Sequence, residues 1–215
     1  MSKVILFQGD SITDCKRDRN DSAAMGKGYA AFVKGSLGAD YPGEYKFYNR
    51  GVSGDRIVDL YARIKADFIN IKPDYASIFI GVNDTWHEVA FNNGVKTEKF
   101  EKIYTMLIEE VKEQLPDIKL ILIAPFVLEG SATVDTENPK KFEFFKKDVV
   151  EKSEVVKKLA EKYGLPLIEL QPVFDEACKK ASSSYWTADG VHPLETGHEL
   201  IKRLWLDAFN EIRRD

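Results

Sequence analysis

The sequence has few cysteines, no excess of positive charge and no long hydrophobic run. Its 215 residues include only Cys15 and Cys178, which lack metal-ligand spacing, so we expect thiols with neither a disulfide framework nor a metal site. The formal net charge is −4 with signs interspersed, which argues against nucleic acid as a partner. The longest apolar run, residues 120–128, contains Pro125. A membrane-spanning helix needs about 20 apolar residues, so we expect no membrane partner.

The N-terminal segment lacks the apolar core of a signal peptide. Residues 4–7 are apolar, but Gln8 and Asp10 follow, whereas a signal peptide carries roughly 7 to 15 apolar residues in a row. We therefore expect a cytoplasmic protein. With 44% hydrophobic residues the chain can bury one core, and its length favours a single domain over residues 1–215.

Short aliphatic and β-branched runs alternate with longer segments of helical periodicity. We predict strands at residues 4–8, 46–49, 75–80, 120–123 and 165–168. We predict helices at residues 29–37, 57–68, 97–114, 139–162, 173–180 and 195–213. Strands separated by helices pair in parallel through right-handed crossovers. The expected fold class is α/β: a three-layer α/β/α sandwich with a five-stranded parallel sheet, as in flavodoxin-like folds.

The last predicted helix carries several large apolar side chains. They are Leu204, Trp205, Leu206 and Phe209. These side chains either pack inward or form an interface in a homo-oligomer.

Polar and titratable residues gather in the loops after the first three strands and before the last helix. In an open parallel sheet, ligands bind outside the carboxyl ends of the strands, so we expect these loops to meet at one edge. The loops are Gly9-Asp10-Ser11-Ile12-Thr13-Asp14, Asn49-Arg50-Gly51-Val52-Ser53-Gly54-Asp55, Gly81-Val82-Asn83-Asp84 and Asp189-Gly190-Val191-His192.

Ser11 is the candidate nucleophile of this edge. A serine hydroxyl needs a general base, usually an imidazole whose tautomer a third group fixes. His192 is the best candidate base, because Asp189 precedes it by three residues and can reach its ring. His198 falls within the last predicted helix, where packing or solvation is expected. His87 follows the third loop, where it either touches substrate or lies at the surface.

The same loops contain donors for an oxyanion and rings that suit a sugar. The N–H groups of Ser11 and Gly54 and the amide of Asn83 are the candidate oxyanion donors. Trp86, Tyr185 and Trp186 lie in or beside the loops, where they either contact sugar rings or pack the loops. The candidate substrate-binding residues are Asp10, Trp86 and Trp186.

Two other functions remain open from the residues alone. A metal-dependent phosphoesterase would use the oxygen ligands that hard cations favour, but it leaves Ser11 and Asn83 unexplained. Its candidate ligands are Asp10, Asp14, Asp84, Asp189 and His192. A non-catalytic flavodoxin-like binding module would hold phosphate in the first loop, which lacks a Gly-rich pattern and contains two acidic residues.

Four segments resemble the marker blocks of the SGNH (GDSL) hydrolases. They are Gly9-Asp10-Ser11-Ile12, Gly51-Val52-Ser53-Gly54, Gly81-Val82-Asn83-Asp84 and Asp189-Gly190-Val191-His192, with Ile12 where the family's short name has leucine. The resemblance runs from about Val4 to the last helix. It implies that Ser11 is the nucleophile, His192 the base and Asp189 its orienting partner. It also implies that the Ser11 amide, Gly54 and Asn83 form the oxyanion hole.

A narrower resemblance concerns the residues around the first and third blocks. Gly9-Asp10-Ser11-Ile12-Thr13-Asp14-Cys15, Gly81-Val82-Asn83-Asp84-Thr85-Trp86 and Ala124-Pro125-Phe126 are similar to small intracellular carbohydrate esterases of the acetylxylan esterase type. This implies a serine ester hydrolase that removes short acyl groups from small or carbohydrate esters and uses no cofactor. The polar loops at residues 14–20, 22–28, 84–93 and 182–190 agree with a small acyl group.

Overall fold

The computed structural model describes residues 2–213 and contains a five-stranded parallel sheet in the order β2-β1-β3-β4-β5. The strands are β1 (Lys3–Gly9), β2 (Tyr45–Asn49), β3 (Tyr75–Phe79), β4 (Lys119–Ala124) and β5 (Leu167–Glu169). Because β1 pairs with both β2 and β3, the loop carrying Ser11 emerges between the loops that follow those two strands. The α/β fold class predicted from the sequence is confirmed.

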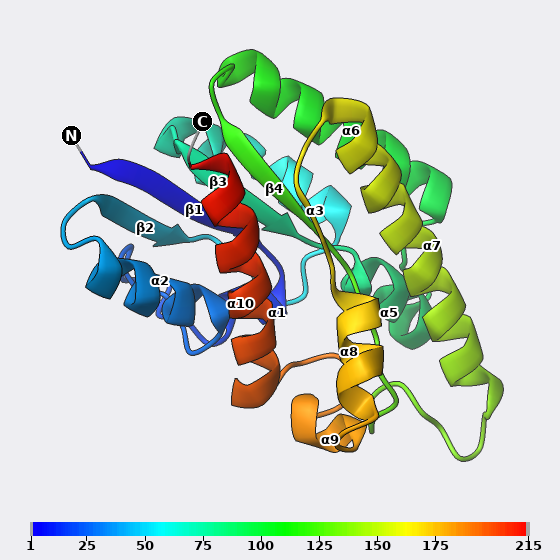
Figure 1. Cartoon of the computed structure of the whole chain (residues 1–215). Coiled ribbons are helices and arrows are strands. Elements are labelled where there is room, and N and C mark those ends of the chain that lie inside the picture. The colour runs from blue at the N-terminus through cyan, green and yellow to red at the C-terminus, as the bar shows by residue number, and fades with distance from the viewer. Residues whose placement is uncertain (1, 214–215) are drawn as a thin grey trace.

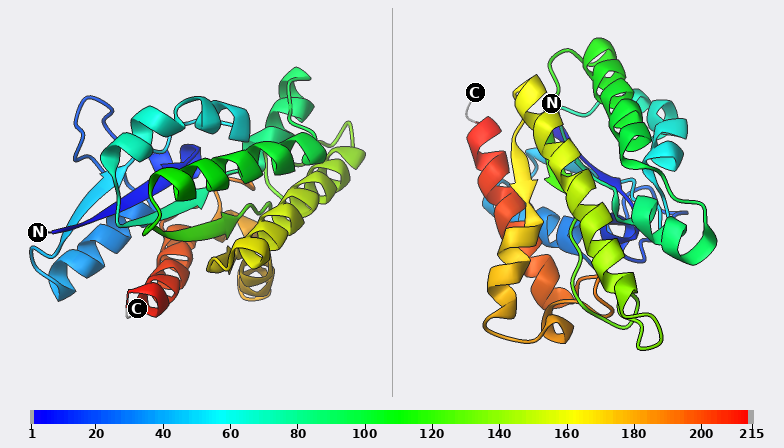
Figure 2. Two further views of the ribbon diagram at one scale, coloured as in Figure 1. Left: turned by 90° about the horizontal axis from the view of Figure 1, so that it is seen from above. Right: turned by 90° about the vertical axis from the view of Figure 1, so that its right-hand side faces the viewer.

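Helices cover both faces of the sheet, as Figures 1 and 2 show. The longer helices are α2 (Tyr29–Asp40), α5 (Val82–Phe91), α6 (Thr97–Gln114), α7 (Lys140–Tyr163), α8 (Leu170–Cys178) and α10 (Glu195–Ile212). The shorter ones are α1 (Ser11–Asp14), α3 (Ile57–Ala62), α4 (Ile64–Asp67), η1 (Ile69–Ile71) and α9 (Ser183–Trp186). Helices α2, α8 and α10 pack on one face, and α3, α6 and α7 pack on the other.

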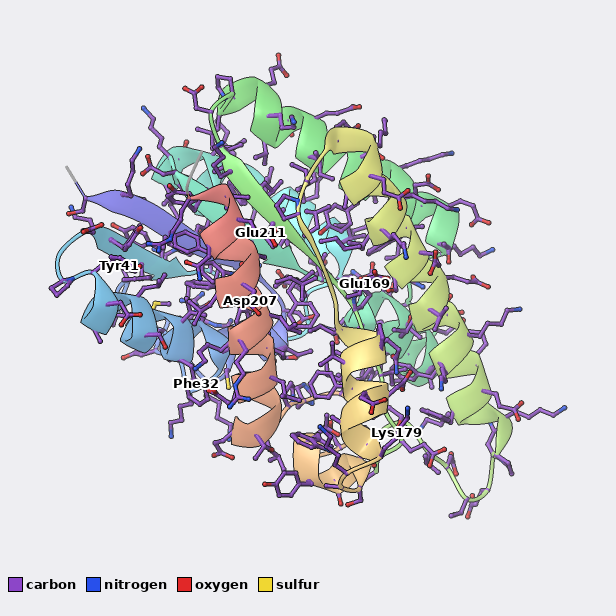
Figure 3. The ribbon with its side chains drawn as sticks, viewed as in Figure 1. Phe32, Tyr41, Glu169, Lys179, Asp207 and Glu211 are labelled. Carbon is purple, nitrogen blue, oxygen red and sulfur yellow. The ribbon has the colours of Figure 1, made fainter. Side chains whose placement is uncertain are left out.

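Alternation along the strands produces two apolar cores, one on each face of the sheet. Ile5 and Phe7 of β1 face α2 and α10, whereas Leu6 between them faces α3 and α6. Trp205 and Phe209 of α10 are fully buried in the first core. Asp207 and Glu211 lie on the outer side of the same helix (Figure 3). The two large rings of α10 are therefore core residues of this chain.

The structure differs from the predicted elements in three places that shape the site. The helix predicted over residues 57–68 is two short helices, α3 and α4, with Arg63 between them. Residues 84–93, predicted as a loop, belong mostly to α5. The predicted loop at residues 182–190 also contains the short helix α9. Within residues 2–213, no helix combines the length and apolarity that crossing a bilayer requires.

Candidate active site

The loops after β1 and β2 pack directly on one another and place Ser11 at the start of α1. Asp10 caps this helix, since its Oδ1 accepts the N–H of Ile12 at 3.0 Å. The N–H of Val52 donates to the carbonyl of Gly9 at 3.0 Å. A Cβ on Gly51 would lie 2.2 Å from the backbone nitrogen of Asp14, so only glycine permits this close approach.

Ser11, His192 and Asp189 form a continuous hydrogen-bonded chain. Ser11 Oγ lies 2.9 Å from His192 Nε2, and His192 Nδ1 lies 2.7 Å from Asp189 Oδ2. The other oxygen of Asp189 accepts the backbone N–H groups of Val191 and His192 at 3.0 and 2.9 Å. These contacts fix the turn before α10, so the carboxylate and the ring share one orientation.

The contact with Asp189 decides which nitrogen of the neutral His192 ring carries the proton: Nδ1, which faces the carboxylate. Burial opposes ionisation of Asp189, but the hydrogen bonds from the His192 ring and from two backbone amides lower its pKa to about 2. Asp189 is therefore ionised and accepts a hydrogen bond from the Nδ1–H of His192. The hydrogen bond to Asp189 raises the pKa of His192, and burial partly opposes this rise. When the ring is neutral, Nε2 is free to accept the Ser11 hydroxyl proton.

The three candidate oxyanion donors come from three different loops. Gly54 has φ +90°, a conformation that glycine adopts readily, and a Cβ there would meet nothing within 4 Å. Asn83 is nearly buried at the start of α5, where its Nδ2 donates one hydrogen to the carbonyl of Asp55 at 3.0 Å. An amide nitrogen carries two hydrogens, so the second remains for a ligand. No hydrogen bond within residues 2–213 uses the N–H of Ser11 or of Gly54.

A cavity of about 510 Å³ opens beside Ser11 and His192. Its walls come from α1, from the loop between α1 and α2, and from the segment that enters α10. The lining residues are Ser11, Ile12, Asp14, Cys15, Lys16, Lys27, Ser53, Ala188, His192, Pro193, Leu194, Glu195 and His198. The wall combines apolar side chains such as Ile12 and Leu194 with the charged side chains of Lys16, Lys27 and Glu195.

The two candidate tryptophans occupy different places. The ring of Trp86, on α5, lies 5.7 Å from the His192 ring, centroid to centroid, and is tilted by 57°. Trp186 lines a separate hollow of about 380 Å³ that α8 and α10 enclose, and its Nε1 donates to the carbonyl of Ala181 at 3.3 Å. Trp86 therefore remains a candidate for substrate contact. Trp186 is not among the residues that line the cavity beside Ser11, so the structure does not bring it together with Ser11 and His192.

The expectation for Asp10 is corrected. Its side chain is fully buried, so it offers no surface to a substrate. Its Oδ2 has no partner within the described part of the chain, and burial raises its pKa to about 7. Asp10 thus supports α1 beneath Ser11. The sequence motif alone could not show that the carboxyl group points inward.

His198 and His87 take no part in the hydrogen bonds that join Ser11, His192 and Asp189. His198 is nearly buried on α10, and its Nδ1 accepts the N–H of Tyr29 at 3.2 Å. Its Nε2 lies 3.5 Å from Cys15 Sγ, and burial lowers the pKa of the ring to about 4. His198 is therefore a neutral packing residue at the cavity wall. His87 stacks edge-on against Phe91 at 5.4 Å.

The acidic residues proposed as metal ligands each bind different groups of the protein. Asp14 pairs with Arg19 at 2.5 Å, and both carboxylate oxygens of Asp84 accept the N–H of Ile57 at 3.1 and 3.2 Å. Across residues 2–213, no three side chains of His, Cys, Asp or Glu are grouped so that they could hold a metal ion. The donor set for a metal-dependent phosphoesterase is therefore not assembled.

Asp55 and Arg63, which the structure places behind the loops, are not among the site residues expected from the sequence. Asp55 follows Gly54, and its side chain is bound by Arg63 at 2.7 Å. One feature of the sequence could have pointed to Arg63. Arg63 falls beside Ile57, Leu60 and Ile64, so it interrupts an apolar stripe at helical spacing.

Comparisons with known proteins agree with this arrangement. Residues 7–200 match the GDSL-like Lipase/Acylhydrolase family. The chain is 35% identical over 211 residues to an acetylxylan esterase of Geobacillus stearothermophilus, covering 94% of this chain and 91% of that one. The crystal structure of an acetylxylan esterase from the same organism superposes with a TM-score of 0.83 and 34% identity, covering 96% and 93% of the two chains.

Further solved structures extend the comparison. A Parabacteroides merdae protein assigned to the GDSL-like lipases superposes with a TM-score of 0.85 and 37% identity, covering 97% and 96% of the chains. Variants of the Geobacillus esterase with a serine, an aspartate or a histidine replaced by alanine are described as catalytic mutants of that enzyme.

Proposed function

Since the chain belongs to the GDSL-like lipase/acylhydrolase family, we propose that Ser11, His192 and Asp189 are the catalytic residues through which it hydrolyses esters. The protein is a serine acyl-ester hydrolase, as its family and its esterase relative indicate. The observation that carries the residue assignment is the 2.9 Å contact from Ser11 Oγ to His192 Nε2, backed by the 2.7 Å contact to Asp189. Both cores lie on the one sheet, which supports a single hydrolase domain over residues 1–215.

Acylation begins when Ser11 Oγ attacks the ester carbonyl carbon and its proton moves to His192 Nε2. The imidazolium that forms is stabilised by the ionised Asp189. Negative charge on the former carbonyl oxygen is met by the N–H groups of Ser11 and Gly54 and by the Asn83 amide. The bond to the alcohol then breaks, and the alcohol oxygen takes the proton from Nε2.

Deacylation repeats these steps with water as the nucleophile. His192 removes a proton from water as the water oxygen attacks the acyl carbon. The second tetrahedral intermediate collapses, Ser11 Oγ leaves and takes back the proton, and the carboxylic acid is released. Each group therefore returns to its starting state.

The substrate class we propose is short acyl esters, chiefly acetyl esters, of sugars. The Geobacillus relative is an acetylxylan esterase, and charged side chains border the cavity beside Ser11. Trp86 stands beside the His192 ring, where an aromatic face can stack on a sugar ring. A cytoplasmic location and a homo-oligomer remain predictions of the sequence.

The residue assignment is tested by replacing Ser11. The Ser11→Ala variant should stay folded and lose several orders of magnitude in kcat on acetylated xylo-oligosaccharides, because it removes the atom that forms the acyl-enzyme. Ser2→Ala is the matched control, since Ser2 is a half-buried serine before the amino end of β1, at the other end of the strand from the site, and its Oγ donates to the carbonyl of Gly43 at 3.1 Å. Retained turnover in Ser11→Ala would refute the assignment.

A further inference from the structure

Arg63 lies at the break between α3 and α4. Its backbone has φ −111° and ψ 9°, which interrupts the helix, and Ile57, Leu60 and Ile64 around it are buried. The Arg63 side chain is only 17% exposed. Because a guanidinium group is seldom withdrawn from water without partners for its donors, the contacts of Arg63 indicate its role.

The guanidinium group of Arg63 donates hydrogen bonds to two backbone carbonyls, one where β1 ends and one just after β2. Nη2 donates to the carbonyl of Gly9 at 3.1 Å, and Nη1 donates to the carbonyl of Arg50 at 2.8 Å. Gly9 is two residues before Ser11, and Arg50 opens the loop that contains Gly54. One planar group therefore fixes the spacing between these two loops.

Arg63 reaches the third loop through Asp55. Its Nε donates to Asp55 Oδ2 at 2.7 Å, in an ion pair whose acidic side chain is 11% exposed. Burial raises the pKa of Asp55, and the charge of Arg63 opposes this rise, which favours the ionised pair. The carbonyl of the same Asp55 accepts the Nδ2 hydrogen of Asn83 at 3.0 Å. The chain from Arg63 through Asp55 thus ends on a candidate oxyanion donor.

We propose that Arg63 is a positioning residue that holds the three oxyanion donors, on Ser11, Gly54 and Asn83, in one arrangement. This inference rests on the proposed function. Arg63 is not among the residues lining the cavity beside Ser11, so it acts through the loops. Donors must stand about 2.7–3.1 Å from the oxyanion, and a displacement of about 1 Å can lower the rate roughly 10²-fold.

The test compares Arg63→Lys with the wild-type enzyme, both measured per active site. Lysine keeps the charge but cannot form the planar set of bonds to two carbonyls and a carboxylate. We expect kcat per site, counted by complete fluorophosphonate labelling, to fall about tenfold or more while KM changes less than about threefold. The inhibition constant of a boronic acid, which forms a tetrahedral adduct on serine, should rise in parallel with the loss of kcat.

Two further variants separate positioning from general stability. Arg203→Lys is the matched control, because Arg203 pairs with Glu199 on the surface of α10 and is 65% exposed. It should leave kcat and KM unchanged. In Arg63→Ala, millimolar ethylguanidinium should restore part of the lost kcat, whereas ethylammonium should not.

Three outcomes would overturn the proposal. In the first, Arg63→Lys has an unchanged kcat per site and only a smaller fraction of the protein is labelled. In the second, only KM changes. In the third, neither constant changes. If Arg63→Lys does not fold, Asp55→Asn carries the test, because it removes the charged anchor beside Gly54 and leaves the other Arg63 contacts in place. Unchanged kcat there would also reject positioning. Activity in Ser11→Ala would reject the proposed function itself, so the two failures are distinguishable.

Discussion

At the scale of the residue, the reactivity of the site depends on which groups are paired and which are left for a substrate. Asp189 uses both oxygens on the turn that carries His192. Asn83 uses one amide hydrogen on Asp55. The protein thus holds both side chains in place, while Asp189 still orients the base and Asn83 keeps one N–H for the oxyanion. Polar groups fixed in this way before the substrate binds are typical of preorganised sites.

Asn83 provides the first prediction at this scale. Replacing it with alanine removes an oxyanion donor, so kcat should fall roughly 10²- to 10³-fold with a smaller change in KM. Steady-state kinetics on one chromogenic acetyl ester measures both constants. A change in KM alone would instead make Asn83 a substrate-binding residue.

The pH dependence follows from the direction of the His192 shift. The ring works as a base only when neutral, and its pKa is raised above the usual 6.5 chiefly by the hydrogen bond to Asp189. Activity should therefore rise with pH through a midpoint above 6.5. Asp189→Asn removes the raising contact while burial still lowers the pKa, so the midpoint should move to lower pH and the plateau should fall. A profile of kcat/KM against pH checks both effects, and an unmoved midpoint would contradict them.

At the scale of the element, the strands and long helices could be predicted and the helix that carries Asn83 could not. The run from Val4 to Phe7 and the periodic spacing in α6 depend on local composition, which the sequence shows directly. In α5, the polar residues Asn83 and Asp84 resemble a loop. They begin a helix because their side chains turn inward to Asp55 and Ile57, contacts that form only after folding.

For the site, the sequence predicted which loops meet but not where each side chain points. The four loops were expected to meet because parallel strands bring their carboxyl ends to one edge, and the structure brings Ser11, His192 and Asp189 together. Side-chain direction was not predictable. Asp10 points into the interior and Trp186 faces other helices, since burial and packing decide both.

The contact between α5 and α7 provides a prediction about stability. Lys152 of α7 is fully buried and donates to Asp148, whose Oδ2 also accepts the Thr85 hydroxyl of α5 at 2.7 Å. Lys152→Met leaves acidic groups without their cation, so the free energy of unfolding should fall by about 3–5 kcal/mol. Lys147→Met on the same helix is the control, since Lys147 is 78% exposed, and it should cost under about 1 kcal/mol. Urea unfolding measures both, and equal losses would contradict the account.

At the scale of the whole molecule, the sheet supplies rigidity and the loops supply the chemistry. The cavity beside Ser11 has a wall of mixed polarity that includes Lys16, Lys27 and Glu195. Each methylene buried in an apolar channel would add about 0.8 kcal/mol of binding, so a long apolar channel would make kcat/KM rise with acyl length. We expect kcat/KM to fall from acetyl to butyryl to octanoyl esters of one chromogenic alcohol. A maximum at octanoyl would contradict the proposed preference for acetyl groups.

The central claim is that Ser11 alone is the nucleophile, and covalent labelling tests it most directly. The protein should be incubated with a fluorophosphonate until activity is lost, digested, and mapped by mass spectrometry. We predict one label per chain, located on Ser11, with the loss of activity proportional to its occupancy. Inactivation with the label on Cys15, on Ser53 or on any other residue, and Ser11 unmodified, would contradict the account.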